Sequence, residues 1–156
     1  MKFPEAAGSN LLRQKLTLPD DLQGELKILL VAFQQWHQAL ADSWLPLANQ
    51  LEQSFPGVQF YEIPVIQRMN FFAQTFINEG MRAGIPNPTT RQKTITLYLD
   101  RQAFMRALDI PNEETIWVLA LDQQGNILWR TSGAYSPENG AALLSTVQAH
   151  LSKKFA

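Results

Sequence analysis

Hydrophobic and polar residues alternate along this chain in blocks that predict strands and helices in turn. Residues 26–33 are almost continuously aliphatic, which is typical of a strand covered on both faces of a sheet. From Trp36 to Phe55, apolar residues recur every three or four positions, a spacing that predicts a helix with one buried face. Pro46 falls inside this pattern and predicts a kink, because proline lacks an amide hydrogen and its ring clashes with the preceding turn.

The middle of the chain predicts a second strand and a second helix. Residues 16–18 alternate as a short edge strand would, and residues 58–63 alternate in the same way. Pro64 is expected to limit how far this second ladder continues. Residues 69–81 place methionine and phenylalanine at helical spacing, whereas the prolines and asparagine of residues 85–94 predict a loop.

The last third of the chain predicts a strand, a short helix, a hairpin and a terminal helix. These elements cover residues 94–99, 101–108, 115–121 with 126–131, and the residues after Ser136. Asp100 and Ser136 are of the residue types that cap helices. The sequence Asp-Gln-Gln-Gly between the two hairpin strands offers Gly125 for a left-handed residue.

This order of elements predicts an α/β fold with three layers. Parallel units come first, and an antiparallel hairpin and a final helix follow, so a central mixed sheet should carry helices on both faces. We expect one domain spanning residues 1–156. Residues 1–15 show no sustained period and are a candidate flexible segment.

The stretch VAFQQWHQALADSWLPLA, residues 31–48, resembles the thioredoxin motif VDFWAEWCGPCKMIAPIL. The matching positions are a strand valine, a strand phenylalanine and the proline of the first helix, here Val31, Phe33 and Pro46. Without gaps, Gln38 and Ala41 replace the two reactive cysteines, and a shift by one residue would place His37 and Leu40 there instead. The resemblance implies a thioredoxin-like domain, with an insertion, that lacks both thiols.

Residues 100–147 resemble the C-terminal half of the mitochondrial F-type ATP synthase assembly proteins of the Atp-ten group. Those proteins carry a helix of the type FRKxLGI and strands of the types GYVYLVD and KIRWAGCG. The matching residues are Phe104, Arg106, Leu108 and Ile110, then Val118, Leu121 and Asp122, then Ile127, Trp129, Arg130 and Gly133. The resemblance implies a factor that helps the membrane sector of ATP synthase assemble. Its partner would be a subunit of that sector, and it would associate peripherally with the membrane through that partner.

Composition narrows the function further. A formal charge of −1 and a pI near 6.1 argue against nucleic acid as a partner. The absence of cysteine excludes thiol–disulfide exchange and sulfur-ligated metal. We expect no cofactor. Residues 1–14 show neither the apolar core of a signal peptide nor the arginines of a transit peptide, so we expect a cytoplasmic location.

Candidate chemistry concentrates at the junction between the strand of residues 26–33 and the helix that follows. His37 lies there, at the edge of the sheet where α/β proteins tend to bind ligands. A general base needs an orienting partner, and only Asp42 is close in sequence, so a surface or capping histidine is the simpler interpretation. The other histidine, His150, is at the far end of the last helix. We therefore predict no metal site and no catalytic residue.

Two functions from different classes remain open. The first is a redox-inactive binding or assembly factor, and its predicted partner-binding residues are Trp36, His37, Gln38, Trp44, Arg82, Arg91 and Arg130. The second is a small-molecule binder or non-redox enzyme that uses the junction around His37. An open pocket lined by His37, Arg82 or Arg91 would favour the second, and a filled junction would count against it. Helical spacing alone would instead place Trp36 and Trp44 in the core.

Overall fold

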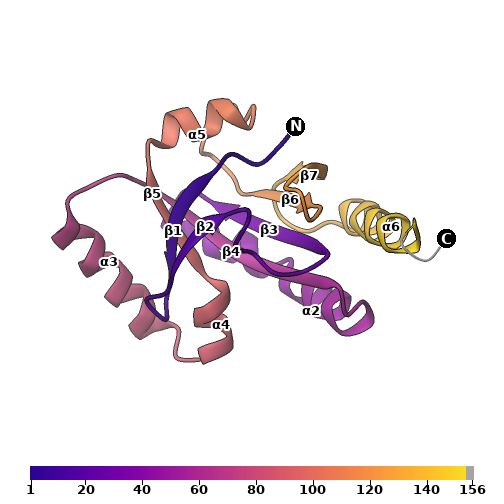
Figure 1. The fold of residues 1–156 in the computed structure, drawn as a ribbon, viewed down its shortest axis with the longest axis horizontal. Helices are drawn as coiled ribbons and strands as arrows, with labels where there is room; N and C mark the ends of the chain where they lie inside the picture. The colour runs from indigo at the N-terminus through magenta and orange to yellow at the C-terminus, as the bar shows by residue number, and fades with distance from the viewer. Residues whose placement is uncertain (154–156) are drawn as a thin grey trace.

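A seven-stranded mixed sheet organises the protein, in a computed structural model that describes residues 1–153 (Figure 1). The strand order is β2-β1-β5-β4-β3-β6-β7. The strands are β1 (Ala6–Asn10), β2 (Lys15–Leu18), β3 (Leu26–Ala32), β4 (Val58–Gln67), β5 (Ile95–Leu99), β6 (Trp117–Leu121) and β7 (Ile127–Ser132). The three central strands β5, β4 and β3 are parallel, and the pairs outside them are antiparallel. The predicted α/β class, with its C-terminal hairpin, is confirmed.

Helices cover both faces of this sheet. They are the 3-10 helix η1 (Gln35–His37), α1 (Gln38–Asp42), α2 (Leu45–Ser54), α3 (Phe71–Gly84), α4 (Pro88–Lys93), α5 (Arg101–Ala107) and α6 (Pro137–Lys153). Side chains of α1, α2 and α6 pack on one face, and those of α5 pack on the other. Helix α3 projects from the side of the molecule (Figure 1). Among residues 1–153, no helix is long and apolar enough to cross a bilayer.

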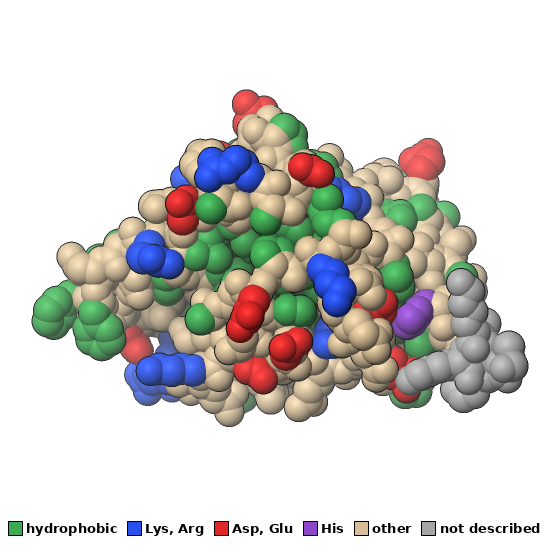
Figure 2. Space-filling model, turned by 45° about the horizontal axis from the view of Figure 1, so that its top comes forward, with side chains coloured by type: hydrophobic (Ala, Val, Ile, Leu, Met, Phe, Trp, Pro, Cys, Tyr) green, Lys and Arg blue, Asp and Glu red, His purple; other side chains and the backbone are tan. Residues whose placement is uncertain are grey.

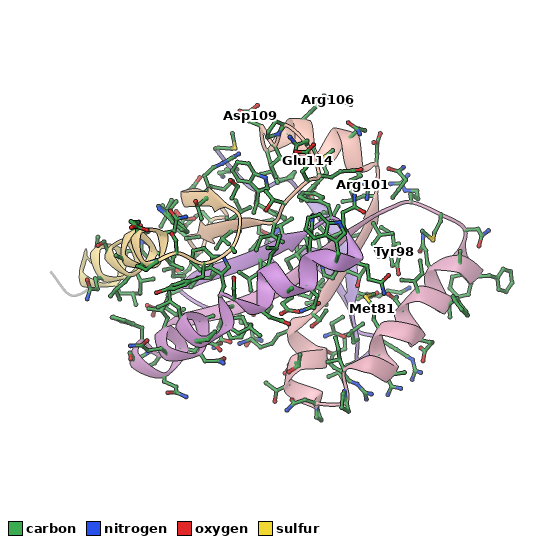
Figure 3. The ribbon with its side chains drawn as sticks, turned by 180° about the vertical axis from the view of Figure 1, so that it is seen from behind. Met81, Tyr98, Arg101, Arg106, Asp109 and Glu114 are labelled. Carbon is green, nitrogen blue, oxygen red and sulfur yellow. The ribbon has the colours of Figure 1, made fainter. Side chains whose placement is uncertain are left out.

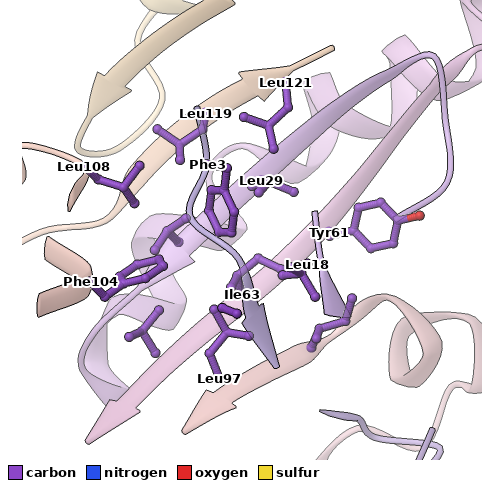
Figure 4. Packing of buried hydrophobic residues seen from close by; sticks show 14 of the residues in the cluster. Phe3, Leu18, Leu29, Tyr61, Ile63, Leu97, Phe104, Leu108, Leu119 and Leu121 are labelled. Atoms are coloured by element: carbon purple, nitrogen blue, oxygen red, sulfur yellow. The ribbon is translucent and has the colours of Figure 1, made fainter. Parts of the chain in front are cut away.

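Each face of the sheet carries its own cluster of buried apolar residues. Strand β3 contributes to both, because successive side chains of a strand point to opposite faces. Leu29 belongs to one cluster and Ile28 to the other. Figure 4 shows the cluster of Leu29, where the N-terminal segment brings Phe3 against Phe104 of α5 with ring centroids 5.7 Å apart. The prediction that β3 is covered on both faces is thereby confirmed.

Residues 1–15, predicted as a candidate flexible segment, supply strand β1 and the start of β2 to the sheet. Phe3 is buried, and β1 pairs antiparallel with both β2 and β5. The sequence of β1, AAGSN, contains no large apolar residue, so it shows none of the alternation that predicts a strand. At Gly8 a β-carbon would lie 2.7 Å from the Thr96 carbonyl oxygen, so the close approach of β1 to β5 requires glycine.

The single kinked helix predicted for residues 36–55 is three separate segments. The chain forms η1 and then α1, breaks at Ser43 and Trp44, and starts again as α2. Pro46 lies in the first turn of α2, where a missing amide hydrogen costs nothing. Proline has thus ended one helix and started the next, instead of bending one continuous helix.

Strand β4 is longer than predicted, since it continues past Pro64 to Gln67. Up to Pro64 the strand pairs with β3, and from Val65 it pairs with β5. Pro64 therefore lies where β4 changes its neighbour, a place that tolerates a residue without an amide hydrogen.

The loop predicted for residues 85–94 contains the short helix α4. The Asn87 side chain caps this helix by accepting hydrogen bonds from the amides of Thr89 (2.9 Å) and Thr90 (3.2 Å), and Pro88 occupies its first position. The proline and asparagine that indicated a loop are in fact the signals of a helix start.

The turn and cap residues predicted for the last third are confirmed. The carboxylate of Asp100 accepts from the Ala103 amide and the hydroxyl of Ser136 accepts from the Asn139 amide, each at 3.2 Å. Gly125 adopts a φ of 83°, the left-handed conformation that the hairpin turn needs. Local chemistry alone therefore placed these boundaries correctly.

Candidate functional site

His37 is fully buried beneath the junction between β3 and η1. Its Nδ1 accepts hydrogen bonds from the amides of Phe33 (3.0 Å) and Gln34 (3.2 Å), so the neutral ring carries its proton on Nε2. That Nε2 is buried and makes no hydrogen bond. Burial lowers the pKa of His37, against the opposing effects of the nearby Glu114 backbone and the Glu113 carboxylate. The residue therefore acts as a cap for the start of η1, the simpler of its two predicted roles.

The junction is filled rather than open. His37 presents no surface to a ligand or a partner, which removes it as a direct contact in either predicted function. Two cavities of the described chain lie elsewhere. One of about 640 Å³ is lined by residues such as Lys27 and Gly57, and one of about 420 Å³ by residues such as Ser9 and Tyr98. This geometry does not favour a small-molecule site at the junction.

The two junction tryptophans, predicted on one helical face, have opposite environments. Trp44 is 1% exposed, and its indole N–H donates to the Gly133 carbonyl at 3.0 Å. Its ring packs edge-to-face against Trp129 (6.3 Å) and Tyr135 (5.5 Å). Trp36 is 61% exposed. The break between α1 and α2 separates the two side chains, so only Trp36 is available to a partner.

Gln38 belongs to a polar group between α1 and β4. Its side-chain amide donates to Asp42 at 2.8 Å. Burial raises the pKa of Glu62, which faces α1 from β4; a hydrogen bond from Gln38 opposes this shift and the Asp42 charge adds to it. Sequence reasoning missed Glu62. The alternation of apolar and polar residues in β4 does not show which residues of other elements the Glu62 side chain contacts.

Arg101 is a junction residue that sequence reasoning also missed. Its guanidinium donates to the Phe33 carbonyl at 3.1 Å and forms an ion pair with Glu113 at 2.8 Å. Its backbone amide donates to the Gln67 side chain at 3.1 Å, so it ties together the ends of β3 and β4 (Figure 3). Arg101 directly follows strand β5 and the capping residue Asp100. Because parallel strands end at one edge of the sheet, this position could have indicated that Arg101 lies at the junction.

Arg130 lies on the face of β7 opposite Trp129, because successive side chains of a strand point to opposite faces. Its guanidinium stacks 4.5 Å from the centroid of the Trp117 ring and donates to the backbone carbonyls of Leu108 and Asp109. These carbonyls are at the C-terminal end of α5, where a cation is favourable. Arg130 therefore has a structural role in closing α5.

The remaining predicted arginines lie on α3 and α4. Arg91 donates from Nη2 to the Arg82 carbonyl at 2.8 Å and from Nε to the Ile85 carbonyl, so it closes the C-terminal end of α3. Arg82 is half-buried, and its Nε has no hydrogen-bond partner. The seven predicted residues thus lie in three places: the junction, β7, and the α3–α4 segment. His37 and Trp44 are buried, and partner binding by the other five residues stays a prediction.

Helix α3 carries the most exposed large apolar side chains of the described chain. Phe71 is 74% exposed, and Phe72 and Phe76 are each 82% exposed. No residue of α3 is buried. The helical spacing of these phenylalanines predicted the helix correctly, but it marks the side that faces away from the protein.

Solved structures with the same architecture include thiol–disulfide proteins and an assembly protein. They include the exposed lipoprotein thioredoxin Etrx1 from Streptococcus pneumoniae (TM-score 0.57, 11% identity, 94% of this chain and 99% of that one). A thiol:disulfide interchange protein from Bacteroides sp. matches with TM-score 0.59 and 16% identity over 95% and 86%. BsSco, of the Sco family of cytochrome c oxidase assembly proteins, matches with TM-score 0.65 and 12% identity over 96% and 92%. Such identities show a shared thioredoxin-like fold only.

The sequence comparisons identify the family. No curated protein matches the chain significantly. The family model described as ATP10 protein matches residues 1–149, almost the whole chain and well beyond the C-terminal half that carried the resemblance. On a thioredoxin-like fold, this match shows that the chain belongs to the ATP10 protein family, the ATP synthase assembly factors that its residues 100–147 resemble.

Proposed function

We propose that this protein is a non-enzymatic, chaperone-like assembly factor that binds a membrane-sector subunit of ATP synthase. The family match over residues 1–149 carries the proposal. It works in the cytoplasm and reaches the membrane through that subunit. The filled junction supports it, because a scaffold whose former reactive edge is sealed by His37 offers a surface for binding rather than a pocket for chemistry.

The proposal includes redox inactivity. The chain contains no cysteine, and the positions that match the reactive thiols hold Gln38 and Ala41 or His37 and Leu40. Purified protein should reduce insulin with dithiothreitol no faster than buffer does. Reduction above the buffer rate would contradict this part of the proposal.

The binding surface is centred on Trp36. This tryptophan is exposed three residues after Phe33, whose carbonyl Arg101 holds, so a rigid edge of the sheet supports it. Tryptophan on a rigid support is the residue type that most often anchors a protein interface. Gln38, exposed on the next turn, adds an amide that can exchange its bond to Asp42 for one to a partner.

Co-purification from a detergent-solubilised membrane extract tests the proposal. Tagged wild-type protein should enrich a membrane-sector subunit of ATP synthase, and Trp36→Ala should reduce this enrichment at least roughly tenfold. Leu128→Ala is the matched control, since Leu128 is an exposed apolar residue on β7. If the wild-type protein enriches no ATP synthase subunit above background, the assembly role is wrong. If Leu128→Ala reduces enrichment as much as Trp36→Ala does, the binding surface is wrongly placed.

A further inference from the structure

Helix α3 presents an apolar face to solvent, which an ordinary surface helix does not do. Its exposed side chains and glycines carry no charge and include Phe71, Phe72, Thr75, Phe76, Gly80 and Ala83. The half-buried side toward the protein is mixed: it carries the polar side chains of Gln74, Asn78 and Glu79 and the smaller or flexible apolar side chains of Ala73, Ile77 and Met81. A helix on the surface of a soluble domain normally places its apolar stripe against the core. The outer face of α3 therefore fits an apolar environment outside the protein.

Specific polar contacts hold α3 in this orientation. The Tyr98 hydroxyl of β5 donates to the Asn78 side chain at 2.8 Å, and Asn78 in turn meets Ser9 of β1 at 3.5 Å. Glu79 forms a two-bond ion pair with Arg13, with distances of 3.0 and 3.1 Å. Figure 3 shows Tyr98 between its strand and α3. Rolling the helix to bury its phenylalanines would break these contacts, so the outward direction of the rings is part of the fold.

The segment of residues 68–93, which contains α3 and α4, differs in net charge from the rest of the chain. Residues 68–93 contain four basic residues and one acidic residue, whereas the rest of the chain contains nine basic and thirteen acidic residues. The one acidic residue, Glu79, is paired with Arg13. Arg68 is exposed just before the phenylalanines. The apolar face is therefore flanked by positive charge on an otherwise acidic protein.

We propose that α3 is a direct membrane-binding helix whose phenylalanines enter the interface of an anionic lipid bilayer. The exposed Arg68 remains among the headgroups, where positive charge is attracted. Figures 1 and 2 show that α3 projects from the body and that hydrophobic side chains gather at its outer end. A projecting, convex tip suits a deformable lipid surface. This inference goes beyond the proposed function, in which the partner alone links the protein to the membrane.

Sedimentation with protein-free vesicles tests the proposal independently of any ATP synthase subunit. The full chain should sediment with vesicles of phosphatidylcholine and phosphatidylglycerol, and more weakly with phosphatidylcholine alone. A combined Phe71→Ser, Phe72→Ser and Phe76→Ser variant should lose at least roughly tenfold in partitioning. Arg68→Gln should weaken binding to the anionic vesicles by a few fold and leave binding to neutral ones unchanged.

Leu128→Ser is the matched control, because it removes an exposed apolar side chain from β7, outside both α3 and the surface around Trp36. It should bind vesicles like the wild-type protein. The proposal is overturned if the wild-type protein does not sediment with anionic vesicles, or if the triple serine variant sediments equally well. It is also overturned in favour of a protein partner if the wild-type protein ignores vesicles but captures a transmembrane peptide in neutral detergent.

The absence of cysteine allows a second, position-specific measurement. A Phe76→Cys variant carries one thiol, which an environment-sensitive fluorophore labels uniquely. Its emission should shift to the blue and intensify when anionic vesicles are added. The same dye at Asn49→Cys, an exposed position on α2, should not respond. An unchanged signal at residue 76, or an equal shift at residue 49, contradicts insertion of α3.

Discussion

Between β3 and α2 the side chains of His37 and Trp44 turn inward, whereas along α3 the phenylalanine side chains turn outward. At the junction, Trp44 is buried among other aromatic rings and His37 receives two backbone amides. On α3, Phe72 and Phe76 are each 82% exposed, and polar side chains make the contacts to the sheet. His37 and Trp44 of the junction are thus part of the core, and α3 is the unusual surface.

The difference shows that an apolar helical period does not say which way a helix faces. Both stretches have apolar residues at helical spacing. At the junction, partners from β7 and the following turn meet Trp44, so burial is favourable. At α3 the facing strand β5 presents the hydroxyl of Tyr98. Polar groups on the inner side of the helix accept hydrogen bonds from this hydroxyl. Burial raises the pKa of Tyr98 to about 12, and the hydroxyl therefore remains a hydrogen-bond donor at neutral pH.

The largest expected effect separates the two tryptophans of the junction. Trp44→Ala should lower the free energy of unfolding by about 3–5 kcal/mol, because it leaves a cavity in the core. Trp36→Ala should change it by less than about 0.5 kcal/mol, because its side chain is mostly in solvent. Urea unfolding followed by circular dichroism measures both. Equal losses in the two variants would mean that the junction is packed differently in solution.

His37→Ala should have the next largest effect. It removes the acceptor of two backbone amides at the junction, and each unpaired buried donor costs about 1–3 kcal/mol. We expect a total loss of about 2–4 kcal/mol in the same urea experiment. His37→Asn, which retains a side-chain acceptor, should recover part of it. A loss below about 0.5 kcal/mol for His37→Ala would contradict the capping role.

Acid should destabilise the protein through the same residue. Because burial lowers the pKa of His37, the unfolded chain binds a proton more readily than the folded protein does. The stability difference is fully present above the unfolded pKa of about 6.5 and is lost as pH falls from there through the folded pKa. Urea midpoints between about pH 8 and 5 should fall more steeply for wild type than for His37→Asn. Parallel curves would assign the acid sensitivity to other groups.

The smallest expected effect is on α3. Phe72→Ser together with Phe76→Ser should change the free energy of unfolding by less than about 0.5 kcal/mol, since neither ring is buried. Equilibrium urea unfolding in the absence of lipid is the measurement. A loss of about 2 kcal/mol or more would show that the phenylalanines are packed in the folded protein in solution. The contrast between α3 and the junction would then disappear.

Specific local signals carried most of the correct predictions. Asp100, Ser136 and Gly125 determine caps and a turn through contacts within a few residues, so the sequence shows them directly. The signals of Asn87 and Pro88 were equally local, but asparagine and proline occur both in loops and at helix starts. The loop was predicted, and the structure has a helix start. Strand β1 could not be predicted, because its pairing partners lie in distant segments and its own residues are small.

The candidate site shows the same division. Trp36 was identified, but its separation from Trp44 depends on the helix break at Ser43 and on rings contributed by β7 and the turn after it. Arg101 and Glu62 were missed, because their partners come from other elements of the chain. The pattern of residues within one segment does not show which other segments pack against it.

By itself the sequence determined the order of most elements after residue 25, the absence of cysteine and the resemblance to ATP synthase assembly factors. These depend on residue types and on spacings within single elements, which are local properties. Only the tertiary structure decided that His37 closes the junction and that the phenylalanines of α3 face outward. The direction of a side chain is set by which segments the fold brings beside it, and those segments are far away in sequence.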